Sequence, residues 1–200
     1  RERNGIVLVN GPAGSGRSTT LAAMLNEVNA TRSCHVVTVE DPIEFLHKHG
    51  AATVNQREVG TDTPSLAAGM RDALRQAAQV LFVGEAHDAE QARLLLEAAE
   101  TGHLVFTSLR GFDTASSVLR LLSLLPVEER AEWRTRVARV LRWSFTQQLL
   151  PHAGGGRRPV VEVWRSTRAT AAHLAEGPLD SATLADVLRD DFGLTGTKIG

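Results

Sequence analysis

Short apolar runs alternate along the chain with stretches whose apolar residues recur at helical spacing. Runs typical of strands buried on both faces stand at residues 6–9, 36–39, 80–83 and 104–106. After the first run, the stretch that begins at Arg17 places Leu21, Leu25 and Val28 on one side of a helix. The alternation predicts an α/β fold, in which a mostly parallel central sheet carries helices on both faces.

Start signals for three further helices follow these runs. Pro64 suits the first position of one helix, and Asp88, with Gln91 three residues later, suits the N-cap of another. Asp113 or Thr114 starts a third helix. Each signal lies between two strand-like runs or after the last one, as the alternating pattern requires.

The last part of the chain has a different pattern. Residues 145–150 and 160–164 are strand-like and flank a glycine-rich tip, which indicates a small hairpin. Residues 181–188 have the spacing of a short amphipathic helix. We therefore expect one domain over residues 1–200, with a core at about 5–150 and a hairpin and carboxyl-terminal helices over 151–200.

The segment between the first strand and the first helix reads GPAGSGRST and fits the phosphate-binding pattern G-x-x-x-x-G-K-[ST], except that arginine stands in place of lysine. Glycines let backbone N–H groups point at phosphate oxygens, and the helix that follows adds its positive end. Because strand, loop and helix occur in the required order, we interpret the segment as an ATP-binding loop, not as a glycine-rich surface turn. The assigned residues are Gly11, Pro12, Gly14, Ser15, Gly16, Arg17, Ser18 and Thr19.

Arg17 raises the question of whether a bound nucleotide is hydrolysed. Lysine supplies a compact charge, whereas arginine brings a wider planar fork. Loss of one preorganised donor costs about 3 kcal/mol, or about a hundredfold in rate. We expect retained binding of ATP with Mg²⁺, for which the Ser18 hydroxyl is a ligand, and weak hydrolysis.

Acidic residues follow two of the predicted strands, where ligands of parallel sheets collect. Glu40 and Asp41 close the second strand, and Glu85 closes the third. Such carboxylates either hold Mg²⁺ and orient the attacking water, or serve as ordinary turn residues and helix caps. His103 opens the fourth strand and either contacts the γ-phosphate or has a structural role.

Composition narrows the classes of partner. The 200 residues carry a formal net charge of -1, so no basic field favours nucleic acid. The single cysteine, Cys34, excludes an internal disulfide framework and a cysteine-cluster zinc site. No apolar stretch approaches the roughly twenty residues of a membrane span. We expect a cytoplasmic protein without direct membrane insertion.

Several ordered motifs together resemble the secretion ATPases of type II secretion and type IV pili, most closely the pilus-retraction, PilT-like branch. The similarity covers residues 5–150. The motifs are GPAGSGRSTTLAAML for the phosphate loop, VTVEDPIEF for the aspartate box, NQREVGTDT after it, LFVGE for the Walker B box and TGHLVFTSL for the histidine box.

This resemblance implies a RecA-like P-loop ATPase domain that works as a homo-oligomer, expected as a hexamer, and couples hydrolysis to pilus retraction. By motif position, Glu85 is the Walker B glutamate, Glu40 and Asp41 belong to the aspartate box, and His103 to the histidine box. Implied partners are an inner-membrane pilus platform protein and a paralogous ATPase, so the protein is expected at the membrane periphery. The family's amino-terminal domain is expected to lie outside this chain.

Departures from the family pattern keep three functions open. Arg17 replaces the loop lysine, Arg110 replaces the second histidine of the histidine box, and residues 76–79 replace an acidic segment. The carboxyl-terminal motif tied to retraction is blurred over residues 168–177. The alternatives are a retraction ATPase, a degenerate nucleotide-binding subunit or regulator of the same machinery, and an unrelated P-loop kinase.

Arginine-rich stretches allow two interpretations. In residues 127–141, apolar side chains form one helical face and arginines lie largely elsewhere, as a solvated face or as a subunit contact with neighbouring acids. Arg57, Arg71 and Arg75 either form surface salt bridges or sense the γ-phosphate across an interface. The apolar residues of the helical face are Trp133, Val137, Val140 and Leu141, and the arginines are Arg134, Arg136, Arg139 and Arg142.

Overall fold

A computed structural model describes residues 2–179, and its strands form one sheet in the order β3-β2-β4-β5-β1-β6-β7. Every neighbouring pair is parallel except β6 and β7, which are antiparallel. The predicted mostly parallel sheet and its hairpin are therefore confirmed. The strands are β1 (Gly5–Asn10), β2 (His35–Glu40), β3 (Thr53–Glu58), β4 (Val80–Val83), β5 (Leu104–Leu109), β6 (Leu141–Pro151) and β7 (Arg157–Arg165).

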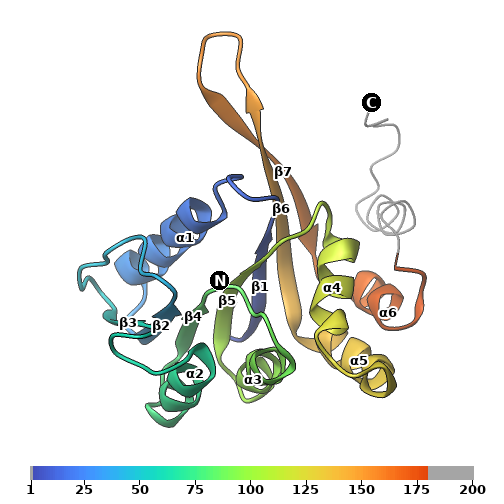
Figure 1. The fold of residues 1–200 in the computed structure, drawn as a ribbon, viewed down its shortest axis with the longest axis horizontal. Coiled ribbons are helices and arrows are strands. Elements are labelled where there is room, and N and C mark those ends of the chain that lie inside the picture. Colours follow the sequence, from blue (N-terminus) through green and yellow to red (C-terminus); the bar gives the residue numbers. More distant parts are fainter. Residues whose placement is uncertain (1, 180–200) are drawn as a thin grey trace.

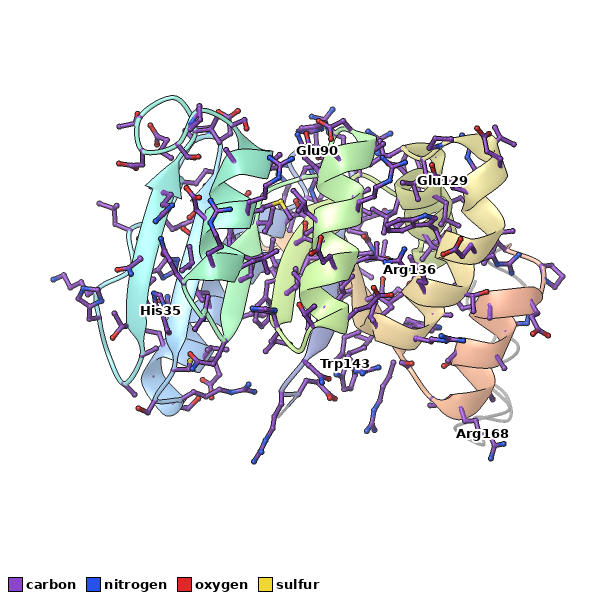
Figure 2. All side chains as sticks on the ribbon, turned by 90° about the horizontal axis from the view of Figure 1, so that it is seen from below. His35, Glu90, Glu129, Arg136, Trp143 and Arg168 are labelled. Carbon is purple, nitrogen blue, oxygen red and sulfur yellow. The ribbon has the colours of Figure 1, made fainter. Side chains whose placement is uncertain are left out.

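Helices cover both faces of the sheet (Figure 1). The side chains of β1 alternate, so that Val7 and Val9 pack with α1 while Ile6 and Leu8 pack with the helices of the other face. On that other face α2, α3 and α5 lie side by side (Figure 2). The helices are α1 (Arg17–Thr31), α2 (Leu66–Arg75), α3 (Ala89–Glu100), α4 (Thr114–Ser123), the 3₁₀ turn η1 (Val127–Glu129), α5 (Arg130–Val140) and α6 (Arg168–Glu176).

Two of the predicted helix starts are confirmed. Asp88 caps α3 by accepting a hydrogen bond from the Gln91 backbone N–H, at 2.8 Å. Asp113 caps α4 in a capping box with Ser116. Both caps satisfy backbone donors that a helix start would otherwise leave unpaired.

The predicted start of α2 is off by two residues. The helix begins at Leu66 and not at Pro64, because Ser65 is the N-cap and its hydroxyl accepts a hydrogen bond from the Ala68 backbone N–H, at 3.1 Å. The side-chain cap thus sets the boundary, in preference to the proline signal.

Strand β3 was not predicted. Its sequence is TVNQRE, and Val54 is its only buried apolar residue. An edge strand of this kind carries too few apolar residues for its period to stand out. Its backbone pairs with β2 in regular parallel register from Thr53 to Glu58.

The arginine-rich helix α5 packs its apolar face into the core, and its arginines contact groups of the same chain. Trp133 and Val137 are buried, Arg136 pairs with Glu100 of α3, and its guanidinium lies 3.8 Å from the centre of the Trp133 ring. The hydrogen bond from Arg136 lowers the pKa of the Glu100 carboxyl. Arg134 donates to backbone carbonyls at the end of α6, which satisfies that helix terminus.

Among residues 2–179, no helix is long and apolar enough to cross a membrane. The predicted amphipathic helix at 181–188 lies outside the described residues.

A polar network joins β1, α4, β6 and β7. The buried Asn10 amide donates to Ser144 Oγ at 2.7 Å, and the Thr114 hydroxyl lies 3.0 Å from the same oxygen. Thr114 also reaches Glu162 Oε1 on β7, at 3.4 Å. Partial removal from water raises the pKa of the Glu162 carboxyl, the Asp113 carboxylate raises it further, and the hydrogen bond from Thr114 opposes both.

We predict that Glu162→Gln stabilises the protein at neutral pH. Because the native pKa of Glu162 lies above its unfolded value, this group destabilises the fold as pH rises from about 4.5 through its native pKa. Glutamine keeps an acceptor for Thr114 without the charge. Urea unfolding should show a higher free energy of unfolding for the variant at pH 7 and no difference at pH 4. An equal gain at both pH values would contradict the assignment.

Candidate functional site

The glycine-rich loop connects β1 to α1, and its backbone requires glycine at two positions. Gly16 has φ +86°, and a Cβ there would lie 2.8 Å from Nε2 of Gln147. A Cβ on Gly11 would lie 2.3 Å from the Gln147 carbonyl oxygen. The loop therefore lies directly against β6, with no room for a side chain at either position.

Gln147 braces this loop. Its side-chain Nε2 donates to the Ser15 carbonyl at 2.6 Å, and its Oε1 accepts from the Thr20 hydroxyl at 2.7 Å. Gln147 is buried, its bond to Ser15 is shielded from water, and its bond to Thr20 is partly shielded. Thr19 is exposed, and it is its neighbour Thr20 that connects to β6.

The amino-terminal end of α1 is open to an anion. Gly16 is the N-cap, no side chain caps the helix, and its first turn has no acidic residue. Its unpaired N–H groups and the helix dipole favour negative charge at this position. Within residues 2–179, the buried Ser15 hydroxyl also has no hydrogen-bond partner. The loop and helix end thus present donors without acceptors.

A pocket of about 470 Å³ lies beside this helix end, at the carboxyl ends of the strands. The structure brings Arg17 and Ser18 of α1 together there with Glu40 at the end of β2, Asp41 directly after it and Glu85 after β4. Residues 11–16 and Thr19 do not line the pocket, and the loop is connected to it through Arg17 and Ser18 at the start of α1. Five residues predicted from separate motifs therefore share one cavity.

Carboxylates line the β2 side of the pocket. The Ser18 hydroxyl donates to Glu44 Oε1 at 3.0 Å, and Glu40 is buried and accepts from Gln56 Nε2 at 3.2 Å. Burial lowers the pKa of His47, which also lines the pocket, while the Glu40 carboxylate opposes this shift. Among the residues that the structure describes, no three His, Cys, Asp or Glu side chains converge as a ready metal site.

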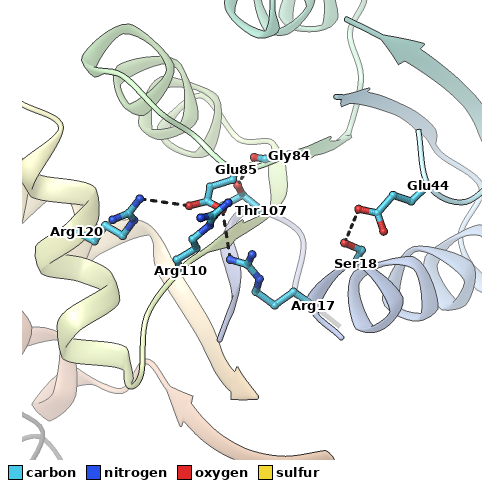
Figure 3. A network of polar contacts seen from close by, with 8 residues as sticks. All are labelled: Arg17, Ser18, Glu44, Gly84, Glu85, Thr107, Arg110 and Arg120. Atoms are coloured by element: carbon cyan, nitrogen blue, oxygen red, sulfur yellow. Dashed lines mark hydrogen bonds and ion pairs between the residues drawn. The ribbon is translucent and has the colours of Figure 1, made fainter. Parts of the chain in front are cut away.

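Arginines surround Glu85 on the opposite side (Figure 3). Glu85 Oε2 lies 3.4 Å from Arg17 Nη1 and 3.3 Å from Arg110 Nε, and Oε1 lies 3.6 Å from Arg120 Nη2. The side chains of Glu85 and Arg17 are only 10% and 14% exposed, against 61% for Arg110 and 46% for Arg120. The Arg17 contact is therefore the least screened of the three.

His103 does not lie in this pocket, which corrects its predicted contact with the γ-phosphate within one chain. It precedes β5, whereas the pocket is lined by Ser108 and Arg110 at the other end of that strand. Its Nδ1 lies 2.9 Å from the Ala98 carbonyl oxygen and 3.2 Å from Thr101 Oγ1. The histidine thus connects β5 to the end of α3, which is a structural role.

The other arginines singled out in the sequence pair with acids of the same chain. Arg57 and Arg75 both contact Asp72, and Arg71 contacts Glu90. These contacts agree with the surface salt-bridge interpretation.

Sequence reasoning missed several residues of the site, among them Arg120, which contacts Glu85. Glu44 belongs to the segment VTVEDPIEF but was not singled out, and Arg110 was noted only as a departure from the family pattern. Gln147 lies on β6, whose sequence LRWSFTQQLLP mixes polar and apolar residues, so no local signal marks it. Its role depends on the sheet order, which puts β6 next to β1.

Comparisons with known proteins agree with this geometry. The type IV pilus retractation ATPase PilT of Pseudomonas aeruginosa is 46% identical over 165 residues, which are 82% of this chain and 48% of that protein. A twitching motility protein of Neisseria gonorrhoeae is 46% identical over 154 residues, 76% of this chain and 41% of that protein. The chain thus spans about half the length of the curated relatives it matches.

The fold also matches solved structures. The crystal structure of the pilus retraction motor PilT with bound ADP superposes with a TM-score of 0.89 at 39% identity, covering 94% of this chain and 55% of that one. This similarity confirms the predicted class of fold. Residues 1–177 match the Type II/IV secretion system protein family, and the chain therefore belongs to that family.

Proposed function

We propose that this chain is the ATP-binding domain of a type IV pilus motor of the retraction type, in which ATP hydrolysis is coupled to pilus disassembly. The observation that carries the proposal is the braced glycine loop, whose open helix end borders the pocket that contains Glu85. The 46% identity to a pilus retractation ATPase supports the biological setting.

The site offers a role for each group. Backbone N–H groups at the start of α1 would bind phosphate oxygens, and Arg17 would add a positive charge. Glu85 would orient the attacking water, since its Oε1 is buried and, within residues 2–179, forms no hydrogen bond, its ion-pair contact with Arg120 being 3.6 Å long. Glu40, buried on the facing side of the pocket, is the second catalytic carboxylate.

The residues present fit Mg²⁺ brought in with the nucleotide. Ser18 and Asp41 supply hard oxygen atoms beside the loop, and Mg²⁺ in nucleotide sites takes one or two protein ligands plus phosphate oxygens and water. Such an ion would neutralise phosphate charge. Ser18 would then exchange its hydrogen bond to Glu44 for the ion.

Assembly and location belong to the same proposal. We propose a homo-oligomer, with a hexamer as its form, that lies in the cytoplasm and reaches the inner membrane through a pilus platform protein and a paralogous ATPase. The relatives named for pilus retraction and twitching motility support this setting. No nucleic-acid role is proposed, because the formal net charge is -1.

One observation favours a second function, a nucleotide-binding subunit with weak hydrolysis. Arg17, which stands where the loop pattern has lysine, contacts Glu85 in a largely buried ion pair. A catalytic carboxylate held by the loop's own cation is less available to water. The two functions share fold and ligand and differ only in turnover.

For the second function, we predict that Arg17→Lys raises ATP turnover about a hundredfold, because a lysine would restore the compact charge of the motif. The complete gene product should bind ATP, turn it over slowly as wild type, and lose turnover altogether as Glu85→Gln. Arg93→Lys, at an ion pair outside the pocket, is the matched control and should match wild type. A wild type as fast as Arg17→Lys would show that the loop tolerates arginine.

We also predict that Gln147→Leu weakens ATP binding about tenfold and lowers the free energy of unfolding by about 1–3 kcal/mol. The Ser15 carbonyl and the Thr20 hydroxyl would lose their partner in a buried setting. Gln148→Leu, at the exposed neighbouring position on β6, is the control. Titration calorimetry and urea unfolding measure the two quantities, and equal behaviour of the two variants would refute the bracing role.

A further inference from the structure

The pocket is divided by charge. Glu40, Asp41 and Glu44 line it on the β2 side, and Arg17 and Arg110 line it on the side of Glu85. Figure 3 draws Glu44 and the two arginines. A phosphate group accompanied by a divalent cation matches this division, with the cation toward the acids and the phosphate toward the arginines.

Sheet order puts Arg110 between the two functional ends of the site. Strand β5 lies between β4 and β1, and Arg110 is the first residue after β5. It therefore stands between the loop that follows β1 and Glu85, which follows β4. From this position the Arg110 guanidinium can contact a phosphate that is bound at the loop of its own chain.

Arg110 and Arg17 compete for one oxygen. Both contact Glu85 Oε2, at 3.3 and 3.4 Å, and Arg120 lies on Oε1 of the same carboxylate. Three guanidinium groups against one carboxylate leave an excess of positive charge. Arg110 contacts Glu85 through Nε and has further donors on a largely exposed side chain, so a second anion has donors to meet.

We propose that Arg110 binds the terminal phosphate of a nucleoside triphosphate in cis, and that this phosphate draws both Arg110 and Arg17 away from Glu85. The inference rests on the proposed nucleotide-binding function and adds a residue that distinguishes triphosphate from diphosphate. Without the terminal phosphate, the two arginines hold Glu85. With it, Oε2 of the carboxylate is released toward water, while Arg120 stays near Oε1.

Two variants should move triphosphate affinity in opposite directions. Arg110→Ala removes a phosphate ligand, whereas Glu85→Gln removes the anion that competes with the phosphate for the arginines. ADP lacks the terminal phosphate, so its affinity should change little in either variant. A merely structural effect would change the affinities for both nucleotides alike.

The test measures the affinity of ADP and of a non-hydrolysable ATP analogue, each with Mg²⁺, for the complete gene product. Arg110→Ala should weaken binding of the analogue about tenfold and binding of ADP less than twofold. Glu85→Gln should tighten binding of the analogue several-fold and leave the affinity for ADP unchanged. Arg93→Ala, an arginine in an ion pair outside the pocket, is the control and should leave both affinities unchanged.

The outcomes separate this inference from the proposed function. If wild type binds both nucleotides and Arg110→Ala weakens neither, or weakens both equally, the role of Arg110 is refuted and the nucleotide site stands. If wild type binds neither nucleotide, the proposed function fails and this inference fails with it. Thermal unfolding of each variant checks that the exposed position tolerates alanine.

Discussion

Parallel pairing of β1, β2, β4 and β5 is the constraint on which the rest of the site depends. Because these strands run the same way, the residues that follow them meet at one edge of the sheet. The phosphate loop, Asp41, Glu85 and Arg110 each follow one of these strands, and Glu40 is the last residue of β2. Strand β6, on the far side of β1, then supplies Gln147 to hold the loop in place.

The contact between Arg17 and Glu85 explains how one substitution in the loop can matter. In water, an ion pair of this length would be worth little, but both side chains are largely buried. Arginine in place of the motif's lysine therefore does more than change the shape of the side chain that binds phosphate. It links the loop to the carboxylate proposed to orient water, and Arg110 reinforces the link from β5.

Sequence patterns predicted the buried parallel strands and the loop because apolar runs and glycine positions are local properties. They missed β3, whose single buried apolar residue is Val54, and they misplaced the role of His103. A motif names a residue without saying which end of a strand faces the ligand. Gln147 and Arg110 depend on the order of strands in the sheet, which no local pattern contains.

The most direct test of the account is a structure of the complete gene product with Mg²⁺ and a non-hydrolysable ATP analogue. The account predicts phosphates on the backbone N–H groups at the start of α1, with Arg17 turned to the terminal phosphate and Glu85 freed from it. Nucleotide bound elsewhere, or bound at the loop with Arg17 still paired to Glu85, would contradict the account.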